Sequence, residues 1–251
     1  MLEYFIQTDT IIAGMTKKDR HAFENNNMAL HSCESVSNII KNRENLAVEL
    51  GVTLEDFVCP TQTHSTNFYE VTAADKGRGA RSLDNAINET DAIYTFETDI
   101  VLCSFSADCV PITFYHDNGV IGVIHSGWRG TVKEITKKLF THLIEEKLCE
   151  PSGFHVHIGA ALCQKNFEVD EDVARQFKQL GYADAFIQYD ASNNKYFIDN
   201  QQTVKKQCSL VGIPAKQIKI NDMCTMDSEA GFSHRRDQGL GRHLTFIRRL
   251  Q

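Results

Sequence analysis

The chain has 251 residues, of which 42% are hydrophobic and 24% are charged, as is ordinary for a globular protein. This composition excludes a disordered tail protein, a coiled coil and a collagen-like fibre, and the length is ample for a buried core. With 26 basic and 33 acidic side chains, the net charge is −7, which argues against a general nucleic-acid or membrane-surface binder.

The sequence predicts a single cytoplasmic domain over residues 1–251. No apolar run approaches the roughly 18 residues that span a bilayer, and residues 1–7 do not resemble a signal peptide. No repeat and no Pro/Gly/Ser-rich linker divides the chain. The eight cysteines form no C-x-x-C pair, so we expect most of them to be reduced core residues.

The first half of the chain predicts one helix and several short strands. A helical stripe covers residues 35–50 and ends at Gly51. The polar segment 72–90, with G-R-G-A-R at 77–81, predicts a mobile, solvated loop, with a phosphate contact as the alternative. The apolar run 100–105 indicates a buried strand. Further β-like runs occur at residues 57–59, 68–71, 92–95, 110–115 and 120–124.

A hairpin is predicted about Asn118-Gly119, because a type I′ turn requires positive φ at both central positions. Direct pairing about this turn places Cys109 opposite Trp128 and His125 opposite Ile112. Both Cys109 and His125 then lie at the open end of the hairpin, with a residual offset of about 10 Å. The pattern therefore predicts proximity of these two side chains, not contact.

The second half predicts helices alternating with strands. Residues 127–130 lead into a helix with Val132, Ile135, Leu139 and Leu143 on one face. A strand is predicted at 154–158, helices near 170–180 and 200–211, and strands near 195–199, 217–220 and 243–248. This mixture, with at least one antiparallel strand pair, predicts an α+β fold of the mixed-sheet α/β sandwich type.

Cys109 and His125 allow two functional interpretations. One is a cysteine nucleophile activated by histidine. The other is a metal site, because thiolate and imidazole suit zinc. His64, in the polar stretch 60–65, is the candidate third ligand, and three protein ligands with an open fourth position are typical of catalytic zinc. A buried cysteine beside two hydrogen-bonded histidines remains the non-functional alternative.

Other polar residues are weaker candidates. The two histidines of H-V-H at 155–157 face one side of their strand, and we expect a structural or surface role for them. His116, beside the predicted turn, is expected to be exposed. Arg129 is a candidate anion ligand because it lies at a helix start. Arg235-Arg236 form either an anion-binding pair or a solvated basic loop.

Several short motifs, taken together, resemble the sequence pattern of one known family. S-A-D-C-V-P resembles an A-D-C-x-P motif, H-S-G-W-R-G resembles H-A-G-W-R-G, and Q-T-H-S is similar to Q-V-H-G; they lie at residues 106–111, 125–130 and 62–65. A C-terminal signature of C-T, F-S-x-R-R and G-R is matched at residues 224–225, 232–236 and 241–242. At this spacing the chain resembles the laccase-domain purine nucleoside phosphorylases, long described as multicopper polyphenol oxidases.

The resemblance implies one zinc ion held by His64, Cys109 and His125. It implies phosphorolysis of adenosine, inosine and methylthioadenosine, and hydrolytic deamination of adenosine. It also implies an α+β fold related to cysteine-hydrolase-like toxin domains. Polyphenol oxidation by several coppers is not expected, because it needs several His-x-His pairs and this chain has one. The chain departs from the family pattern at four positions: Ser65, Ser126, Ala160 and Leu240.

Purine nucleosides and phosphate are the expected small-molecule partners. Cys109 and Asp108 are the candidate catalytic residues, with Asp108 transferring a proton, orienting a ligand or capping a local turn. Arg129 is the expected phosphate clamp. The candidate substrate contacts are Arg43, Gln62, Trp128 and Arg235.

Two other functions compete with this one. A metal-free cysteine hydrolase or deamidase, such as an editing enzyme of cell-wall precursors, would use Cys109 as nucleophile and His125 as base. It would not require His64. A non-enzymatic redox or metal-handling protein would require neither Asp108 nor Arg129.

Overall fold

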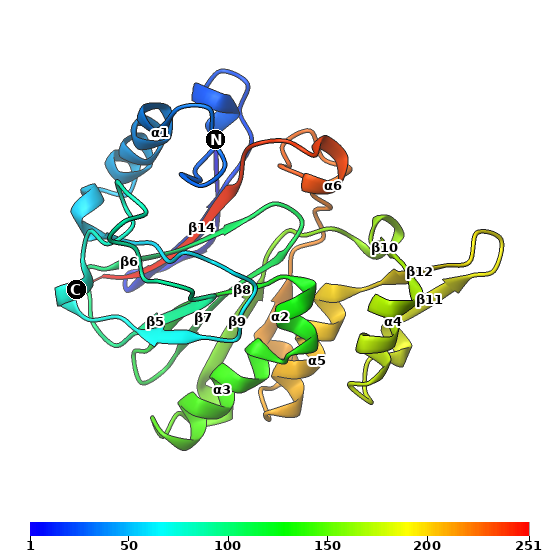
Figure 1. The fold of residues 1–251 in the computed structure, drawn as a ribbon. Coiled ribbons are helices and arrows are strands. Elements are labelled where there is room, and N and C mark those ends of the chain that lie inside the picture. Colours follow the sequence, from blue (N-terminus) through cyan, green and yellow to red (C-terminus); the bar gives the residue numbers. More distant parts are fainter. Residues whose placement is uncertain (251) are drawn as a thin grey trace.

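The computed structural model describes residues 1–250, and its strands form three sheets (Figure 1). The five-stranded sheet consists, in spatial order, of β1 (Leu2–Gln7), β2 (Ile11–Thr16), β14 (His243–Arg249), β6 (Val101–Ser106) and β3 (Phe57–Val58). The six-stranded sheet consists of β13 (Ile218–Ile220), β9 (Phe154–Ile158), β7 (Val110–His116), β8 (Ile121–Ser126), β5 (Ala92–Thr95) and β4 (Phe68–Glu70). The smallest sheet consists of β10 (Glu168–Val169), β12 (Lys195–Ile198) and β11 (Ile187–Asp190).

The two larger sheets pack face to face, and some of the helices cover their outer faces. The helices are α1 (Val36–Glu49), α2 (Trp128–Val132), α3 (Ile135–Glu145), α4 (Glu171–Lys178), α5 (Asn200–Leu210) and α6 (His234–Asp237). Ile93, Leu102 and Ile247 belong to the core between the sheets. Helix α1 packs on the five-stranded sheet, and α3 and α5 pack on the six-stranded sheet (Figure 1). The predicted α+β sandwich is confirmed.

The strands at the N-terminus were absent from the prediction. Strand β1 is only half buried along its length, so it carries no clear apolar alternation. Its partner β2 contains Gly14, which is required because a Cβ atom there would lie 2.6 Å from the Glu3 carbonyl oxygen. Strand β14 inserts between β2 and β6 and pairs with both in the antiparallel sense. Strands from the first and the last part of the chain therefore belong to one sheet.

The single helix predicted after residue 127 is two helices. The chain breaks at Glu134, which has φ +61° between α2 and α3. The Thr131 carbonyl accepts a hydrogen bond from the Gln207 side chain at 2.8 Å, and the Glu134 carboxylate accepts one from the Tyr182 hydroxyl at 2.9 Å. Side chains of distant segments thus stabilise the break, which helical periodicity alone does not reveal.

The hairpin forms, but the predicted turn type and register are wrong. His125 pairs with Pro111, not with Ile112, so the register differs by one residue. Of the two turn residues, only Gly119 has positive φ, at +95°. The Asn118 backbone N–H donates to His116 Nδ1, while His116 Nε2 contacts the Glu150 carbonyl oxygen at 2.8 Å. His116 is therefore buried, contrary to the prediction that it is exposed.

The arginines of the segment 72–90 are held by protein groups. Arg78 forms an ion pair with Asp75 at 2.8 Å. Arg81 forms ion pairs with Glu44 and Glu55. Neither arginine lines the large cavity described below. The alternative of a phosphate contact in this segment gains no support.

Candidate active site

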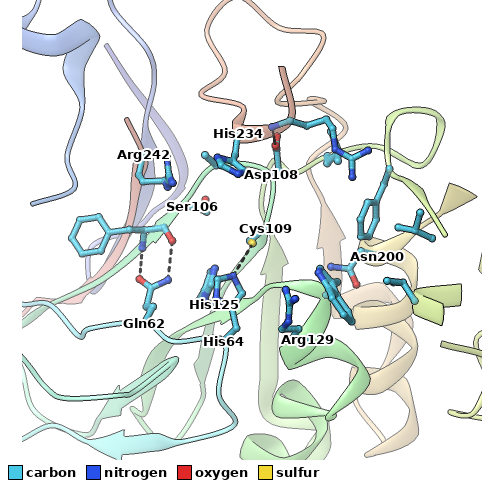
Figure 2. A pocket seen from close by; sticks show the side chains of 18 of the residues that line it. Gln62, His64, Ser106, Asp108, Cys109, His125, Arg129, Asn200, His234 and Arg242 are labelled. Atoms are coloured by element: carbon cyan, nitrogen blue, oxygen red, sulfur yellow. Dashed lines mark hydrogen bonds between the residues drawn. The ribbon is translucent and has the colours of Figure 1, made fainter. Parts of the chain in front are cut away.

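A cavity of about 720 Å³ opens where the hairpin β7–β8 meets α2 and the small sheet (Figure 2). Ligand pockets typically occupy 300–1,000 Å³. Its walls come from every part of the chain and include His31, Gln62, His64, Phe105, Asp108, Cys109, His125, Trp128, Arg129, Phe167, Asp170, Asn200, His234, Arg235 and Arg242. The cavity is thus assembled by the whole fold.

Three side chains on one wall point toward a common centre (Figure 2). His64 Nε2 lies 3.7 Å from Cys109 Sγ, and donor atoms of His64, Cys109 and His125 all lie within 4.8 Å of one another. Tetrahedral metal ligands of nitrogen and sulfur lie about 3.5 Å apart. The three donors therefore fit one metal ion with a fourth position facing the cavity, and the predicted proximity of Cys109 and His125 is confirmed.

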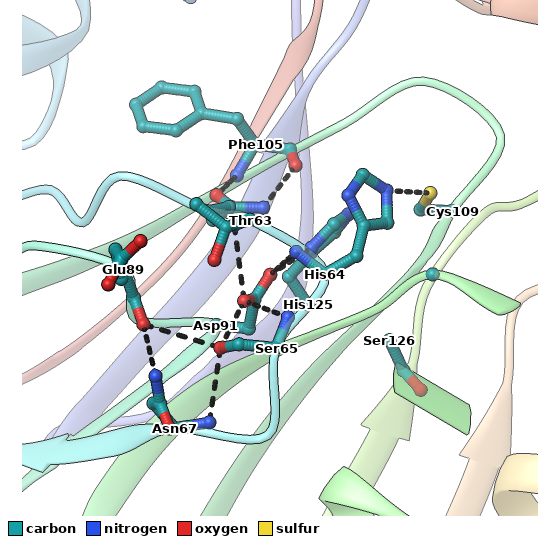
Figure 3. A network of polar contacts seen from close by, with 12 residues as sticks. Thr63, His64, Ser65, Asn67, Glu89, Asp91, Phe105, Cys109, His125 and Ser126 are labelled. Atoms are coloured by element: carbon teal, nitrogen blue, oxygen red, sulfur yellow. Dashed lines mark hydrogen bonds and ion pairs between the residues drawn. The ribbon is translucent and has the colours of Figure 1, made fainter. Parts of the chain in front are cut away.

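A buried carboxylate orients one of these ligands (Figure 3). Asp91 Oδ1 accepts a hydrogen bond from His125 Nδ1 at 2.8 Å, and the Asp91 side chain is fully buried. Because Nδ1 donates to Asp91, Nε2 is the nitrogen that faces the other two donors and can bind a metal, as is usual for metal-binding histidines. The hydrogen bond from His125 overcomes the opposing effect of burial and lowers the pKa of Asp91. Asp91 therefore remains ionised.

The same carboxylate also holds the segment that carries His64. Backbone N–H groups of Thr63, His64 and Ser65 donate to the two Asp91 oxygens at 2.6–3.2 Å. The Ser65 hydroxyl adds a further bond of 2.6 Å (Figure 3). His64 has φ +58°, a conformation that is uncommon outside glycine, and these bonds stabilise it. One side chain thus positions two of the three candidate ligands.

Gly127 leaves room for the ligands. A Cβ atom at this position would lie 2.4 Å from His64 Cδ2 and 3.0 Å from Cys109 Sγ. The glycine has φ −63°, so the requirement is steric and not conformational. Any larger residue would displace the ligand side chains.

In the metal-free protein the thiol and the imidazole form an ion pair. Burial raises the pKa of Cys109, but the His125 charge and hydrogen bonds from His125 and His64 outweigh it and lower the pKa to about 6. Burial lowers the pKa of His125, but the Cys109 thiolate and Asp91 outweigh it and raise the pKa to about 9. At neutral pH Cys109 is therefore a thiolate, which is the form that binds metals and attacks electrophiles.

Asp108, beside the ligand cysteine, is engaged in structural hydrogen bonds. Its Oδ1 accepts from the Thr225 hydroxyl at 2.6 Å, and its Oδ2 accepts from the Arg235 backbone N–H at 2.6 Å. Its carbonyl oxygen accepts from the Leu162 backbone N–H. Asp108 has φ +82°, so these bonds hold an unusual backbone conformation next to Cys109. The geometry favours a positioning role over proton transfer.

The other predicted contacts have different environments. The Gln62 side chain exchanges two hydrogen bonds with the Phe105 backbone, at 2.7 and 2.8 Å, and so ties the His64 segment to β6. The Arg129 guanidinium stacks on Trp128 with 4.2 Å to the ring centroid, and both side chains line the cavity. Helix α2 has only five residues, so a helix dipole adds little to Arg129.

Arg235 lines the cavity, whereas Arg43 lies behind its wall. Arg43 is 1% exposed and donates to the backbone carbonyl groups of Met28, Gly79 and Ala80. Its guanidinium also stacks on Phe105. Arg43 is therefore a structural residue that supports the cavity, and the predicted substrate contact gains no support.

Five further residues of the site were missed by sequence reasoning: His31, Asp91, Asn200, His234 and Arg242. Burial lowers the pKa of His31 to about 4, assisted by Arg242 and Arg43, so this imidazole is neutral. Asn200 Oδ1 is buried and, within residues 1–250, has no hydrogen-bond partner. A lone Asp or Asn gives no sequence signal, but His234 and Arg242 lie inside the motif-like C-terminal segments.

The remaining histidines and cysteines do not extend the ligand set. His157 stacks on Phe5 and His155 stacks on Tyr115, which supports the predicted structural role. All eight cysteines are free thiols, and five of them are buried. Among residues 1–250, no helix is long and apolar enough to cross a membrane.

Comparisons with known proteins cover nearly the whole chain. The sequence model of the family described as multi-copper polyphenol oxidoreductase laccase matches residues 13–250. A protein named purine nucleoside phosphorylase YlmD, from Bacillus subtilis (strain 168), is 32% identical over 98% of this chain and 93% of its own length.

Two solved structures are also similar to this chain. The crystal structure of YlmD from Geobacillus stearothermophilus has a TM-score of 0.91 and 32% identity, over 96% of this chain and 92% of that one. The Bacillus licheniformis hypothetical protein YfiH has a TM-score of 0.91 and 30% identity, over 96% and 93% of the two chains.

Proposed function

The chain belongs to the multi-copper polyphenol oxidoreductase laccase family, and from this premise we propose that it is a zinc-dependent purine nucleoside phosphorylase. Relatives at this level of similarity carry the name purine nucleoside phosphorylase. The observation that carries the proposal is the His64–Cys109–His125 cluster at the wall of a cavity large enough for a nucleoside and phosphate.

Zinc is the metal that best fits the ligand set. One thiolate and two imidazoles are the donors that zinc binds in tetrahedral sites, and Gly127 allows the His64 and Cys109 side chains to approach each other. When bound, zinc supplies Lewis-acid chemistry of the kind used by hydrolytic and group-transfer enzymes. Asp91 holds His125 in the tautomer required for binding.

Cationic groups around the cavity would bind phosphate. Arg129, Arg235 and Arg242 line it, and guanidinium groups match the geometry of phosphate oxygens. Arg129 is pre-oriented by its stack on Trp128. Asp108 holds the backbone of Arg235, so it positions this cation without contacting phosphate itself.

Aromatic and amide groups would bind the nucleoside. Trp128 and Phe167 line the cavity and offer apolar faces on which a purine can stack. Asn200 also lines the cavity and is a candidate contact for a nucleoside hydroxyl or amino group. Adenosine, inosine and methylthioadenosine are the proposed nucleosides, and adenosine deamination is the proposed second activity.

Copper-dependent polyphenol oxidation is not the proposed activity, despite the family description. Several coppers need several clusters of histidine. Among the described residues, His64, Cys109 and His125 form the one cluster of potential ligands that contains histidine. This ligand set suits a single metal ion.

A metal-free cysteine hydrolase is the second candidate, and one observation favours it. Cys109 contacts His125, and His125 donates a hydrogen bond to Asp91. Cysteine hydrolases use the same arrangement of nucleophile, base and orienting carboxylate. The two proposals differ in their need for His64, because the zinc site requires it as a ligand and the Cys–His–Asp triad does not.

We also propose that residues 1–251 act as one cytoplasmic domain. The cavity takes residues from near the start of the chain, such as His31, and near its end, such as Arg242. Eight free cysteines are compatible with a reducing compartment.

Chromatography of adenosine incubated with the purified zinc-loaded protein, with and without phosphate, tests the proposal. Adenine that forms only with phosphate establishes phosphorolysis, and inosine that forms without phosphate establishes deamination. Cys33→Ser is a matched control, because Cys33 is a partly exposed thiol outside the cavity. If neither product forms, while His64→Ala leaves the reactivity of Cys109 intact, the hydrolase proposal replaces this one.

A further inference from the structure

A second group of potential metal-binding atoms lies outside the cavity. Sγ of Cys163, Sγ of Cys224 and a carboxylate oxygen of Asp227 lie within 4.8 Å of one another. Cys163 Sγ is 3.8 Å from Asp227 Oδ2, close to the spacing of about 3.5 Å between tetrahedral ligands of one metal ion. None of these residues lines the cavity, and the proposed function does not use them.

The backbone fixes the two cysteines relative to each other, although they are 61 residues apart. Ala161 and Cys224 form an isolated parallel bridge, and the Thr225 N–H donates to the Ala161 carbonyl at 3.0 Å. The Cys163 N–H donates to Cys224 Sγ at 3.3 Å. The pair is therefore a preformed feature, not a chance encounter of mobile side chains.

One nitrogen atom sits where a cation would be expected. Asn166 Nδ2 lies 3.3 Å from Cys163 Sγ, 3.3 Å from Cys224 Sγ and 2.8 Å from Asp227 Oδ1. An amide group has two protons and cannot serve three acceptors well. A metal ion bound by Cys163, Cys224 and Asp227 would take the place of this amide as the common partner of the three acceptors.

The charges of the group suit a divalent cation. Burial raises the pKa of Cys224, but a hydrogen bond from Cys163 outweighs it and lowers the pKa. Burial and the hydrogen bond to Cys224 raise the pKa of Cys163 to about 12, so the Cys163 thiol keeps its proton at neutral pH. Lys165 pairs with Asp227 at 2.9 Å, but Lys165 and Asp227 are both solvent-exposed and can separate.

We propose that Cys163, Cys224 and Asp227 form a second metal site, for a thiophilic divalent cation such as Zn²⁺. Two thiolates and a carboxylate are ligands that zinc accepts, and metal binding displaces protons from ligand thiols. The site lies directly behind the catalytic wall: Leu162 and Thr225, the neighbours of the two cysteines, both donate hydrogen bonds to Asp108. A metal ion here would clamp the two segments that hold Asp108.

Cadmium is the probe for this site, because a Cd²⁺–thiolate bond absorbs in the ultraviolet. The titration uses the Cys109→Ala protein, which lacks a ligand of the first site. We expect one equivalent of Cd²⁺ to bind with a thiolate band, to release protons and to be displaced by Zn²⁺. We also expect Zn²⁺ to raise the thermal unfolding temperature of this variant.

The ligand variants are made in the same Cys109→Ala background. Addition of Cys224→Ser should remove the band, whereas Asp227→Asn should keep it and weaken binding by about tenfold. Addition of Cys33→Ser should change neither. Cys163→Ser provides the same test as Cys224→Ser if the latter fails to fold.

Three outcomes would overturn the proposal. The first is absence of the band in Cys109→Ala, and the second is its persistence in both Cys163→Ser and Cys224→Ser. The third is a loss of two thiols to a disulfide between Cys163 and Cys224 in the untreated protein. Nucleoside turnover is not needed for any of these measurements, so the test is independent of the proposed function.

Discussion

The two candidate metal sites differ in what holds their ligands. At the cavity, the fully buried Asp91 bonds His125 and three consecutive backbone N–H groups, so the ligands are fixed from behind. At the second site the carboxylate is itself a proposed ligand, is solvent-exposed and pairs with Lys165. Within the part of the chain that the structure describes, no buried carboxylate is among the hydrogen-bond partners of the Cys163–Cys224 pair.

This difference separates a catalytic site from a structural one. A reactive centre needs ligands held in one geometry before substrate arrives, because small displacements are costly to the rate. A clamp between two surface segments can gain its geometry from the metal. The first site should therefore lose function when its support is altered, and the second should respond chiefly to loss of its own ligands.

The largest effect is expected from Cys109→Ala. This change removes the only thiolate of the first site, and we expect zinc bound at the cavity and nucleoside turnover to be lost together. A loss of about 4 kcal/mol of transition-state stabilisation would lower kcat/KM by about a thousandfold. Metal analysis and phosphorolysis assays check this. Full activity with the cavity metal absent would contradict the zinc assignment.

Gly127→Ala should have the next largest effect. The new Cβ would lie 2.4 Å from His64 and 3.0 Å from Cys109, so the ligands must move apart. Misplacement of this size typically costs about 100-fold in rate. Gly181→Ala is the matched control, because a Cβ at Gly181 meets no atom within 4 Å, although its φ of +74° adds local strain. Unchanged turnover in Gly127→Ala would show that the three ligands do not act together.

Asp91→Asn tests the buried support directly. The amide keeps the shape but loses the charge that favours the His125 Nδ1–H tautomer, and second-shell changes of this kind weaken metal binding by about 10- to 100-fold. Zinc competition with a chelator measures the affinity. In contrast, Asp91→Asn should leave Cd²⁺ binding by Cys163 and Cys224 unchanged. Equal loss at both sites would mean general unfolding, and the comparison of the two sites would fail.

Part of the candidate site could be predicted from the sequence, and part could not. The hairpin that brings Cys109 and His125 together was predicted, because Asn-Gly between two apolar runs is a local signal. His64 was predicted as the third ligand from its place in a polar stretch, and the motif resemblance implied the same residue. Asp91 was missed because a single aspartate before a strand has no pattern, and its role depends on contacts with residues 26–34 positions away.

Non-local contacts explain the other differences. The break between α2 and α3 depends on Gln207 and Tyr182, which are far along the chain. The one-residue error in the hairpin register arose because the loop has three residues, 117–119, and is closed by Gly119 at positive φ, which is the next most common hairpin loop. Arg43 was predicted as a substrate contact because a guanidinium group can bind phosphate, whereas three backbone carbonyl groups hold it in the interior.

The smallest effect is a difference in thiol reactivity with pH. A thiol reacts with iodoacetamide as its thiolate, so the rate rises as pH rises through the pKa. In the metal-free protein Cys109, with a pKa of about 6, should be alkylated at neutral pH, whereas Cys163, with a pKa of about 12, should not. Mass spectrometry of peptides after alkylation at pH 5 to 9 measures both. If Cys109 and Cys163 were alkylated with the same pH dependence, the predicted difference between their thiol pKa values would be wrong.

The position of β14 has a consequence for how the protein is made. This strand, residues 243–249, fills the gap between β2 and β6 in the middle of the five-stranded sheet. During synthesis both neighbours emerge long before it, and their unpaired edges stay exposed until residue 249 has left the ribosome. A nascent chain stalled before β14 therefore presents two open strand edges to chaperones, and Arg242 reaches the cavity only in the last step of assembly.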